Sequence, residues 1–272
     1  MPSIATPAPP AQAGDRPPRS QKWPDAIWIA RHGQSAGNVA RDAAEAGGQH
    51  LIDIATRDVD VPLSALGQAQ AGALSRWFAS MDLHVQPQVV LASPYVRALD
   101  TARTVADALS GQRRVPVVAD ERLREKEFGI LDRMTVAGIR SMHPALSEQR
   151  RHVGKFYFRP PGGESWCDVI LRLRSVLDTL TREYVGERVL IVAHQVVVNC
   201  FRYLFERMTE SEVLALDRAA DVPNCGVTLY EFDPAAGHHG KLVLRFANFL
   251  APLEHEGTPV TRAPDVPVAP KP

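Results

Sequence analysis

Apolar runs and amphipathic stretches alternate along most of this chain. The short apolar runs, which have the composition of buried strands, cover residues 26–30, 89–92, 115–118 and 188–193. Apolar positions at helical spacing predict helices over 64–78, 95–110, 136–142, 168–184 and 197–208. Two late runs, 227–232 and 242–246, predict a terminal hairpin. This order predicts an α/β fold, a three-layer α/β/α sandwich with a mostly parallel central sheet and some antiparallel character from the hairpin.

The two ends of the chain differ from this pattern. Residues 1–24 are rich in proline and alanine, and residues 251–272 are rich in proline. Both compositions are typical of disordered tails, so residues 25–250 are predicted to form a single domain. The first residues lack the charged start and apolar centre of a secretory signal, and no apolar stretch is long enough to span a membrane.

The charge balance limits the class of partner that is expected, and the cysteine content limits the expected compartment. Lysine plus arginine and aspartate plus glutamate are balanced at 31 each, so there is no global basic field for nucleic acid or an acidic membrane. The three cysteines are odd in number and have no metal-pair spacing, which indicates a reducing compartment. We therefore expect a cytoplasmic protein whose partner is a small molecule. The sequence leaves the oligomeric state open.

Candidate chemistry lies just past the ends of two predicted strands. Residues 31–35, with the sequence RHGQS, follow the first strand, and His194 follows the run at 188–193. Ligands of open α/β sheets bind at the carboxyl ends of the strands, so neighbouring strands would bring the two imidazoles face to face. A neutral imidazole such as His32 can act as a nucleophile, and the guanidinium of Arg31 can neutralise phosphoryl oxygens.

Three more candidates follow two other strands. Arg97 lies about one turn into a predicted helix, whose N-terminus favours anions. Glu125 and Glu127 are of the type that can hold a proton and protonate a departing alkoxide. The residues alone leave ordinary alternatives open, namely an exposed helical arginine and a charged loop whose carboxylates pair with Arg124 or Lys126.

Five segments, in order, resemble the motifs of the histidine phosphatase superfamily, also called the phosphoglycerate mutase-like superfamily. They are RHGQSAGN at 31–38, LSALGQAQ at 63–70, SPYVRALDTA at 93–102, LREKEFG at 123–129 and PPGGES at 160–165. Each motif is weak alone, but five in the family's order make a specific match that spans nearly the whole domain. The resemblance implies the phosphoglycerate mutase-like fold.

The resemblance also implies roles for individual residues. His32 would be the phosphorylated nucleophile and Glu125, rather than Glu127, the proton donor. The phosphoryl oxygens would be held by Arg31, Arg97 and His194, with Asn38 as a further donor. Other candidate substrate contacts are Gln34, Ser35, Gln195 and Arg159. Many members have glycine where this chain has Gln195, although the His-Gln pair also occurs in the fructose-2,6-bisphosphatase branch. No cofactor or metal is expected, because arginines and histidine take the place of Mg²⁺.

Three functions are compatible with these residues. The favoured one is a metal-independent phosphatase that hydrolyses small phosphate monoesters through phosphohistidine, acting on a phosphorylated metabolite. The segment between residues 129 and 161 resembles that of broad-range phosphatase-like members more than the longer insertion of glycolytic mutases. The alternatives are a cofactor-dependent phosphoglycerate mutase and a non-enzymatic phospho-ligand binding module, which would have no need of Glu125.

The segment that should overhang the site is basic. Its cations are Arg150, Arg151, Lys155 and Arg159. Binding of a second anionic group of the substrate and a solvated basic loop are both compatible with this composition.

Overall fold

A computed structural model describes residues 21–111 and 114–262. The strands of this part of the chain are β1 (Ala26–Arg31), β2 (Val89–Ala92), β3 (Val117–Ala119), β4 (Arg188–Ala193), β5 (Val227–Asp233) and β6 (Lys241–Phe249). The longer α-helices are α1 (Ala36–Ala46), α2 (Ala65–Ala79), α3 (Val96–Leu109), α5 (Pro144–Val153), α6 (Trp166–Glu183), α7 (Gln195–Glu206) and α8 (Glu210–Ala219). Shorter helices are α4 (Val136–Met142), α9 (Ala251–Glu254) and the 3₁₀ turns η1 (Asp58–Asp60), η2 (Glu121–Leu123) and η3 (Gly129–Leu131).

The six strands form one sheet in the order β3-β2-β4-β1-β5-β6. The first four are parallel to one another, whereas β5 and β6 are antiparallel. The predicted mostly parallel sheet and terminal hairpin are therefore confirmed, and β3, which begins directly after Pro116, lies at one edge. In the register of β1 and β4, Arg31 lies opposite Ala193. The two strand ends that carry the histidines are thus direct neighbours.

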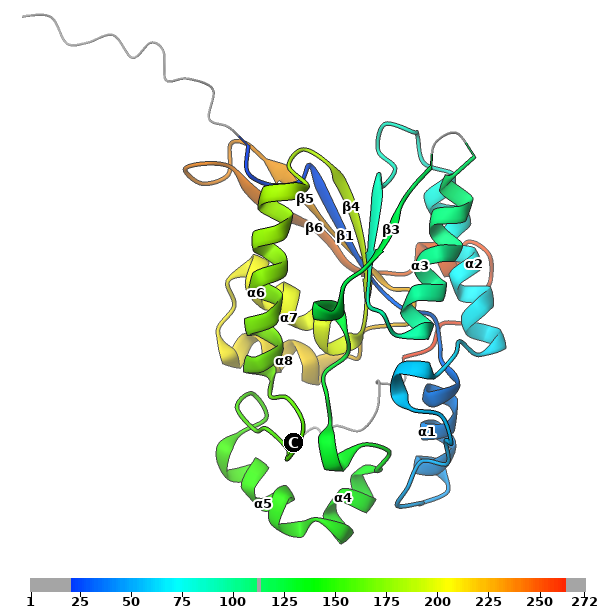
Figure 1. Cartoon of the computed structure of the whole chain (residues 1–272), viewed down its shortest axis with the longest axis vertical. Coiled ribbons are helices and arrows are strands. Elements are labelled where there is room, and N and C mark those ends of the chain that lie inside the picture. Colours follow the sequence, from blue (N-terminus) through cyan, green and yellow to red (C-terminus); the bar gives the residue numbers. More distant parts are fainter. Residues whose placement is uncertain (1–20, 112–113, 263–272) are drawn as a thin grey trace, which may run out of the picture.

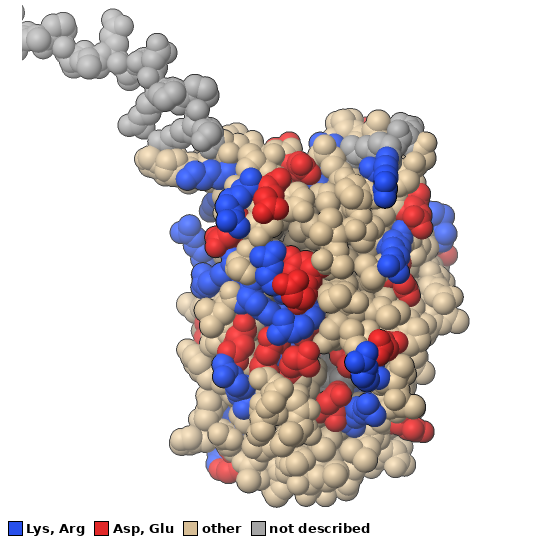
Figure 2. Space-filling model, in the orientation of Figure 1, with Lys and Arg blue, Asp and Glu red and all other residues tan. Residues whose placement is uncertain are grey.

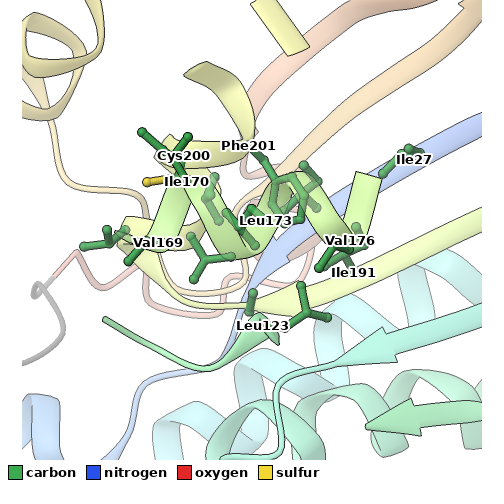
Figure 3. Close-up of a cluster of buried hydrophobic side chains, with 14 of the residues drawn as sticks. Ile27, Leu123, Val169, Ile170, Leu173, Val176, Ile191, Cys200 and Phe201 are labelled. Atoms are coloured by element: carbon green, nitrogen blue, oxygen red, sulfur yellow. The ribbon is translucent and has the colours of Figure 1, made fainter. Parts of the chain in front are cut away.

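Helices cover both faces of the sheet, as the α/β/α prediction requires (Figure 1). Successive residues of a strand point to opposite faces, so Ile27 and Ile29 contact one layer while Trp28 and Ala30 contact the other. The first face packs against α6 and α7, whose apolar side chains interdigitate with those of β1 and β4 (Figure 3). The second face packs against α2 and α3.

A smaller apolar cluster lies outside the main core. It consists of Leu131, Met134, Ile139 and Phe158. These side chains pack α4 against the residues that precede it and against those that follow α5. In Figure 1, α4 and α5 lie beyond one end of the sheet, the same end at which α1 starts. The segment between residues 129 and 161 therefore lies at the carboxyl end of the parallel strands, where the candidate site residues lie.

The structure corrects the predicted C-terminal boundary. Residues 251–262 were expected in a tail, but they include α9, whose Leu253 is fully buried against α2 and α3. Thr261 also hydrogen bonds to Asn224. The sequence prediction was based on the high proline content of residues 251–272 as a whole, which gave no sign that Leu253 is buried. At the other end, Trp23 packs against the α6–α7 layer. The rest of both predicted tails, residues 1–20 and 263–272, lies outside the described residues.

Acidic and basic side chains are interleaved over the surface that faces the viewer in Figure 2. This arrangement agrees with the balance of charges in the sequence and shows no extended basic face on that side. Among the residues that the structure describes, no helix has the length and apolar character needed to cross a membrane.

Candidate active site

The pairing of β1 with β4 brings His32 and His194 together. Each histidine directly follows its strand, and the two strands are parallel neighbours. The ring centroids are 5.0 Å apart in an edge-to-face arrangement, and both side chains are fully buried. The prediction that the two imidazoles meet at one edge of the sheet is confirmed.

The hydrogen bonds of His32 define which ring nitrogen carries the proton. Its Nδ1 lies 2.6 Å from the carbonyl oxygen of Gly33, which can only accept, so Nδ1 is the donor. On the other side, the Nε–H of Arg97 points at Nε2 from 3.3 Å. An arginine N–H can only donate, so Nε2 presents its lone pair. This is the neutral tautomer that a nucleophilic histidine requires.

The loop that carries His32 is fixed by a close backbone approach. A Cβ atom on Gly67 of α2 would lie 2.8 Å from the carbonyl carbon of Gln34, and one on Gly33 would lie 3.1 Å from that of Gly67. The amide of Gly33 donates to the hydroxyl of Thr101 at 3.1 Å, and the amide of Gln34 donates to Gln70 at 2.8 Å. The LSALGQAQ motif therefore supports the histidine loop through contact of two glycines.

Arg97 is the second residue of α3, which begins directly after the turn that follows β2. Its side chain is buried, and its Nη1 donates to the backbone carbonyl of Asp58 at 2.6 Å. The Asp58 carboxylate also lies 3.0 Å from Nη1 and 3.2 Å from Nη2. Asp58 thus orients the guanidinium whose Nε reaches His32. Asp58 was not among the predicted site residues, since an aspartate in a short 3₁₀ turn carries no motif signal.

Arg31 is held by a segment far away in the sequence. Its Nη1 donates to the carbonyl of Val222 at 2.6 Å, and the Asn224 side chain donates to the carbonyl of His32 at 3.0 Å. Because β5 is antiparallel to β1, the residues that precede β5 lie at the same edge where β1 ends. Asn224 was also missed, because its place depends on the order of strands in the sheet.

Ser35 and Asn38 start α1 through a capping box. The Ser35 hydroxyl accepts from the amide of Asn38 at 3.1 Å, and the Asn38 side chain accepts from the amide of Ser35 at 2.9 Å. Both side chains are buried, and both residues follow His32 within two turns of chain, at positions 35 and 38. The N-terminus of α1 therefore lies at the same edge as the histidines, which places a partial positive charge there.

The remaining predicted substrate contacts have partners in the protein. Gln34 accepts from the Ser64 hydroxyl at 2.7 Å, and Gln195 donates to Asp221 at 2.7 Å. Both glutamines are buried. Arg159 lies at the surface, 63% exposed, and its Nε donates to Asp168 at 2.7 Å.

Glu125 and Glu127 occupy different environments. The Glu125 side chain is 1% exposed and accepts from the amide of Lys126 at 2.7 Å. The Glu127 carboxylate is 46% exposed and accepts from the Tyr95 hydroxyl at 2.9 Å. The Tyr95 ring lies 5.2 Å from the ring of His194, so Tyr95 links residues 122–128, here called the acid segment, to the histidines. Tyr95 lies within the SPYVRALDTA motif, which could have indicated it.

Burial shifts the pKa values of several groups in and around this site. It lowers the pKa of Lys126 to about 8 and the pKa of Arg150 to about 10. The pKa of Tyr95 is raised by burial and by the neighbouring Glu127 carboxylate. Within the described part of the chain, no group of three or more His, Cys, Asp or Glu side chains is arranged to hold a metal ion.

Comparisons with known proteins agree with this arrangement. The sequence profile of the histidine phosphatase superfamily (branch 1) matches residues 27–243. The chain is 32% identical over 199 residues to the bifunctional protein Rv2228c of Mycobacterium tuberculosis (strain ATCC 25618 / H37Rv), which covers 71% of this chain and 49% of that protein. This chain therefore spans about half the length of the first relatives it matches. A 2,3-bisphosphoglycerate-dependent phosphoglycerate mutase of Sinorhizobium fredii (strain NBRC 101917 / NGR234) is 28% identical over 199 residues, covering 72% and 86% of the two chains.

A solved structure supports the fold. The mycobacterial glucosyl-3-phosphoglycerate phosphatase Rv2419c in complex with VO₃ aligns with a TM-score of 0.62 at 23% identity, over 83% of this chain and 100% of that one. Both a mutase and a phosphatase are thus similar to this chain. The profile covers most of the sequence, and the segments with the family's motifs contact one another around one sheet edge, so the chain belongs to the histidine phosphatase superfamily, branch 1.

Proposed function

We propose that this protein is a phosphatase that hydrolyses small phosphate monoesters through a phosphohistidine at His32. The observation that carries the proposal is the environment of the His32 ring. Its Nδ1 is fixed on the Gly33 carbonyl, and its Nε2 lone pair lies in a group of cationic and polar side chains. A nucleophile held in one tautomer beside Arg97 and His194 suits attack on a phosphoryl group.

In the first transfer, the lone pair of His32 Nε2 forms a bond to phosphorus while the bond to the ester oxygen breaks. Arg31, Arg97 and His194 stabilise the charge on the three equatorial oxygens, and the Nε–H of Arg97 turns from Nε2 to one of them. Glu125 gives its proton to the departing oxygen. The cationic side chains supply the positive charge that metal ions supply in many other phosphoryl-transfer enzymes.

In the second transfer, the Glu125 carboxylate takes a proton from water as the water oxygen attacks phosphorus. The bond between phosphorus and Nε2 breaks, its electron pair returns to the ring, and phosphate leaves. Glu125 ends protonated, ready for the next ester. Its burial supports this role, because a side chain that is 1% exposed is shielded from bulk water during the proton transfer.

Substitution of His32 by alanine tests the covalent step. We expect His32→Ala to lose about three orders of magnitude in kcat, because the covalent route is removed. Brief incubation with a ³²P-labelled ester should leave acid-labile label on the wild type but not on this variant. His84→Ala, at an exposed histidine in the loop before β2, is the control and should keep full labelling. Turnover near the wild-type rate in His32→Ala would refute the proposal.

The proton-donor role has its own test. Glu125→Gln should still form phosphohistidine with p-nitrophenyl phosphate, whose leaving group needs no proton, but should fail to form it with an alkyl phosphate. Glu127→Gln should not discriminate between the two esters, because its exposed carboxylate bonds to Tyr95. Equal losses for both esters in Glu125→Gln would contradict the assignment.

Similarity to a phosphoglycerate mutase supports a second candidate, phosphoryl transfer between positions of one substrate. Incubation with 3-phosphoglycerate and 2,3-bisphosphoglycerate separates the two reactions. Phosphate release that outpaces isomerisation supports the phosphatase, and the opposite order supports the mutase. A chain that binds phosphate esters but converts none of them would be a binding module.

The role of Arg159 in substrate binding stays a prediction with a direct test. Its ion pair with Asp168 lies at the surface, so a substrate anion would have to compete with that carboxylate. Charge reversal in Arg159→Glu should raise KM for a substrate with a second anionic group and leave KM for p-nitrophenyl phosphate unchanged. An unchanged KM for both kinds of ester would exclude this contact.

A further inference from the structure

The segment that carries Glu125 is not part of a regular helix or strand. It runs from η2 to η3, and Figure 1 shows it passing alongside α6. At its start, Leu123 is fully buried and packs into the cluster formed by α6, α7 and the sheet (Figure 3). Beyond Leu123, a different set of interactions must hold the backbone of the proton donor in place.

A largely buried ion pair provides several of those interactions. Arg172 of α6 donates from Nε to Glu164 Oε1 at 2.9 Å and from Nη2 to Glu164 Oε2 at 3.1 Å. The two side chains are only 11% and 13% exposed. Paired, parallel hydrogen bonds of this kind fix the direction of both groups.

The same two residues form several hydrogen bonds with the backbone of the acid segment. Arg172 donates to the backbone carbonyls of Arg122 and Glu125, the latter at 3.2 Å. Glu164 accepts from the amide of Glu127 at 3.1 Å, and its own amide donates to the Glu127 carbonyl at 2.9 Å. The backbone on both sides of the Glu125 side chain is therefore bonded to this pair.

The pair itself is mounted on a rigid element. Glu164 directly precedes Ser165, the N-cap of α6, which forms a capping box with Asp168. Arg172 lies about two turns further along the same helix. Burial raises the pKa of Glu164, but the hydrogen bonds and charge of Arg172 lower it more, so the carboxylate stays ionised at neutral pH. A charged pair on a capped helix is a stable reference for a loop.

We propose that Glu164 and Arg172 are positioning residues that set the height and direction of the Glu125 carboxyl above the reacting phosphoryl group. This inference rests on the proposed function, because it assigns to the PPGGES turn and to α6 a part in proton transfer. Neither residue contacts the ester. Each acts through the backbone of the segment from Arg122 to Glu127.

The leaving-group dependence of turnover tests the proposal. Glu164→Gln and Arg172→Lys should slow single-turnover formation of phosphohistidine from an alkyl phosphate roughly 10- to 100-fold, the scale expected for a displacement near 1 Å. With p-nitrophenyl phosphate, the rate of this step should stay within about threefold of wild type, because that leaving group needs no proton. KM should stay unchanged for both esters. Equal losses with both esters would show a general structural effect and overturn the proposal.

A matched control is present in α7. Arg202 donates to Glu206 at 2.7 and 3.1 Å, and these side chains are 11% and 22% exposed. Among the residues that the structure describes, this pair has no hydrogen bond to the acid segment, and its further partner is Tyr230 of β5, whose hydroxyl donates to Glu206. Glu206→Gln should therefore show no preference between the two esters, even if it loses stability. A selective loss for the alkyl phosphate in this control would also overturn the proposal.

Two further measurements isolate the path through Glu125. In the double variant Glu125→Gln/Glu164→Gln, the second change should slow alkyl phosphate hydrolysis by no more than about twofold, because the group it positions is already absent. A further large loss would contradict the proposal. Amide exchange of residues 122–128 should be at least about tenfold faster in Arg172→Lys than in wild type or Glu206→Gln.

The exchange measurement does not depend on turnover. If the wild type hydrolysed neither ester, the proposed function would fail. Unchanged exchange of residues 122–128 in Arg172→Lys would instead refute the positioning role, whatever the activity.

Discussion

Substitution of Gly67 by alanine should destabilise the protein and disturb the His32 loop. The new Cβ would lie 2.8 and 2.9 Å from backbone atoms of Gln34, inside the 3.4–4 Å of ordinary contact. Overpacking of this kind costs about 1–3 kcal/mol, and backbone on both sides places this site near the upper end. Loss of the hydrogen bond from the Ser64 amide to the Gln34 carbonyl, 2.9 Å long, adds about 1 kcal/mol. Alanine gains about 1 kcal/mol within a helix, so the net loss should be about 3 kcal/mol.

Urea unfolding followed by circular dichroism measures this loss. Gly72→Ala, five residues later in the same helix, is the control. A Cβ there would meet only the flexible, exposed side chain of Arg76, at 3.2 Å. Gly72→Ala should therefore be neutral or stabilising by up to about 1 kcal/mol. If Gly67→Ala were as stable as Gly72→Ala, the close approach of the two backbones would be refuted.

Three other substitutions test the core, a helix cap and a buried charge. Leu173→Ala in α6 should cost about 2–5 kcal/mol in urea unfolding, because the side chain is fully buried (Figure 3), whereas Leu171→Ala, 64% exposed, should cost far less. Ser165→Ala should cost about 1 kcal/mol by the same measurement, because it removes the hydroxyl that caps α6, and no change would contradict the capping box. Burial lowers the pKa of Lys126 from 10.5 to about 8, so the folded protein carries a cost of about 3 kcal/mol below pH 8. That cost fades between pH 8 and 10.5, where the unfolded chain still holds the proton. Lys126→Met should therefore exceed the wild type in stability at pH 7 and lose much of this advantage by pH 10, and an advantage independent of pH would contradict the buried charge.

Local patterns predicted most of the fold. Apolar runs gave β1, β2 and β4, because strands buried on both faces need continuous apolar sequence. Amphipathic spacing gave α2, α3 and α6 to within a few residues. The pattern did not indicate α1, α5, α8 and α9, each of which buries at most two apolar side chains.

The sequence by itself indicated the candidate site residues. His32 and His194 follow parallel strands, and the carboxyl ends of parallel strands share one edge, so their meeting depends only on those strands being neighbours. Arg97 and Glu125 were likewise marked by short motifs next to strands. Local sequence specifies these positions because each one is tied to the end of an element.

Only the tertiary structure decided what holds these residues in place. Asp58 on Arg97, Asn224 on the His32 carbonyl and the pair of Glu164 with Arg172 on the acid segment all join parts of the chain far apart in sequence. Such contacts depend on strand order, on the antiparallel direction of β5 and on the path of irregular loops. A residue's own sequence neighbourhood contains none of that information, so the supports of this site could be read only from the packed molecule.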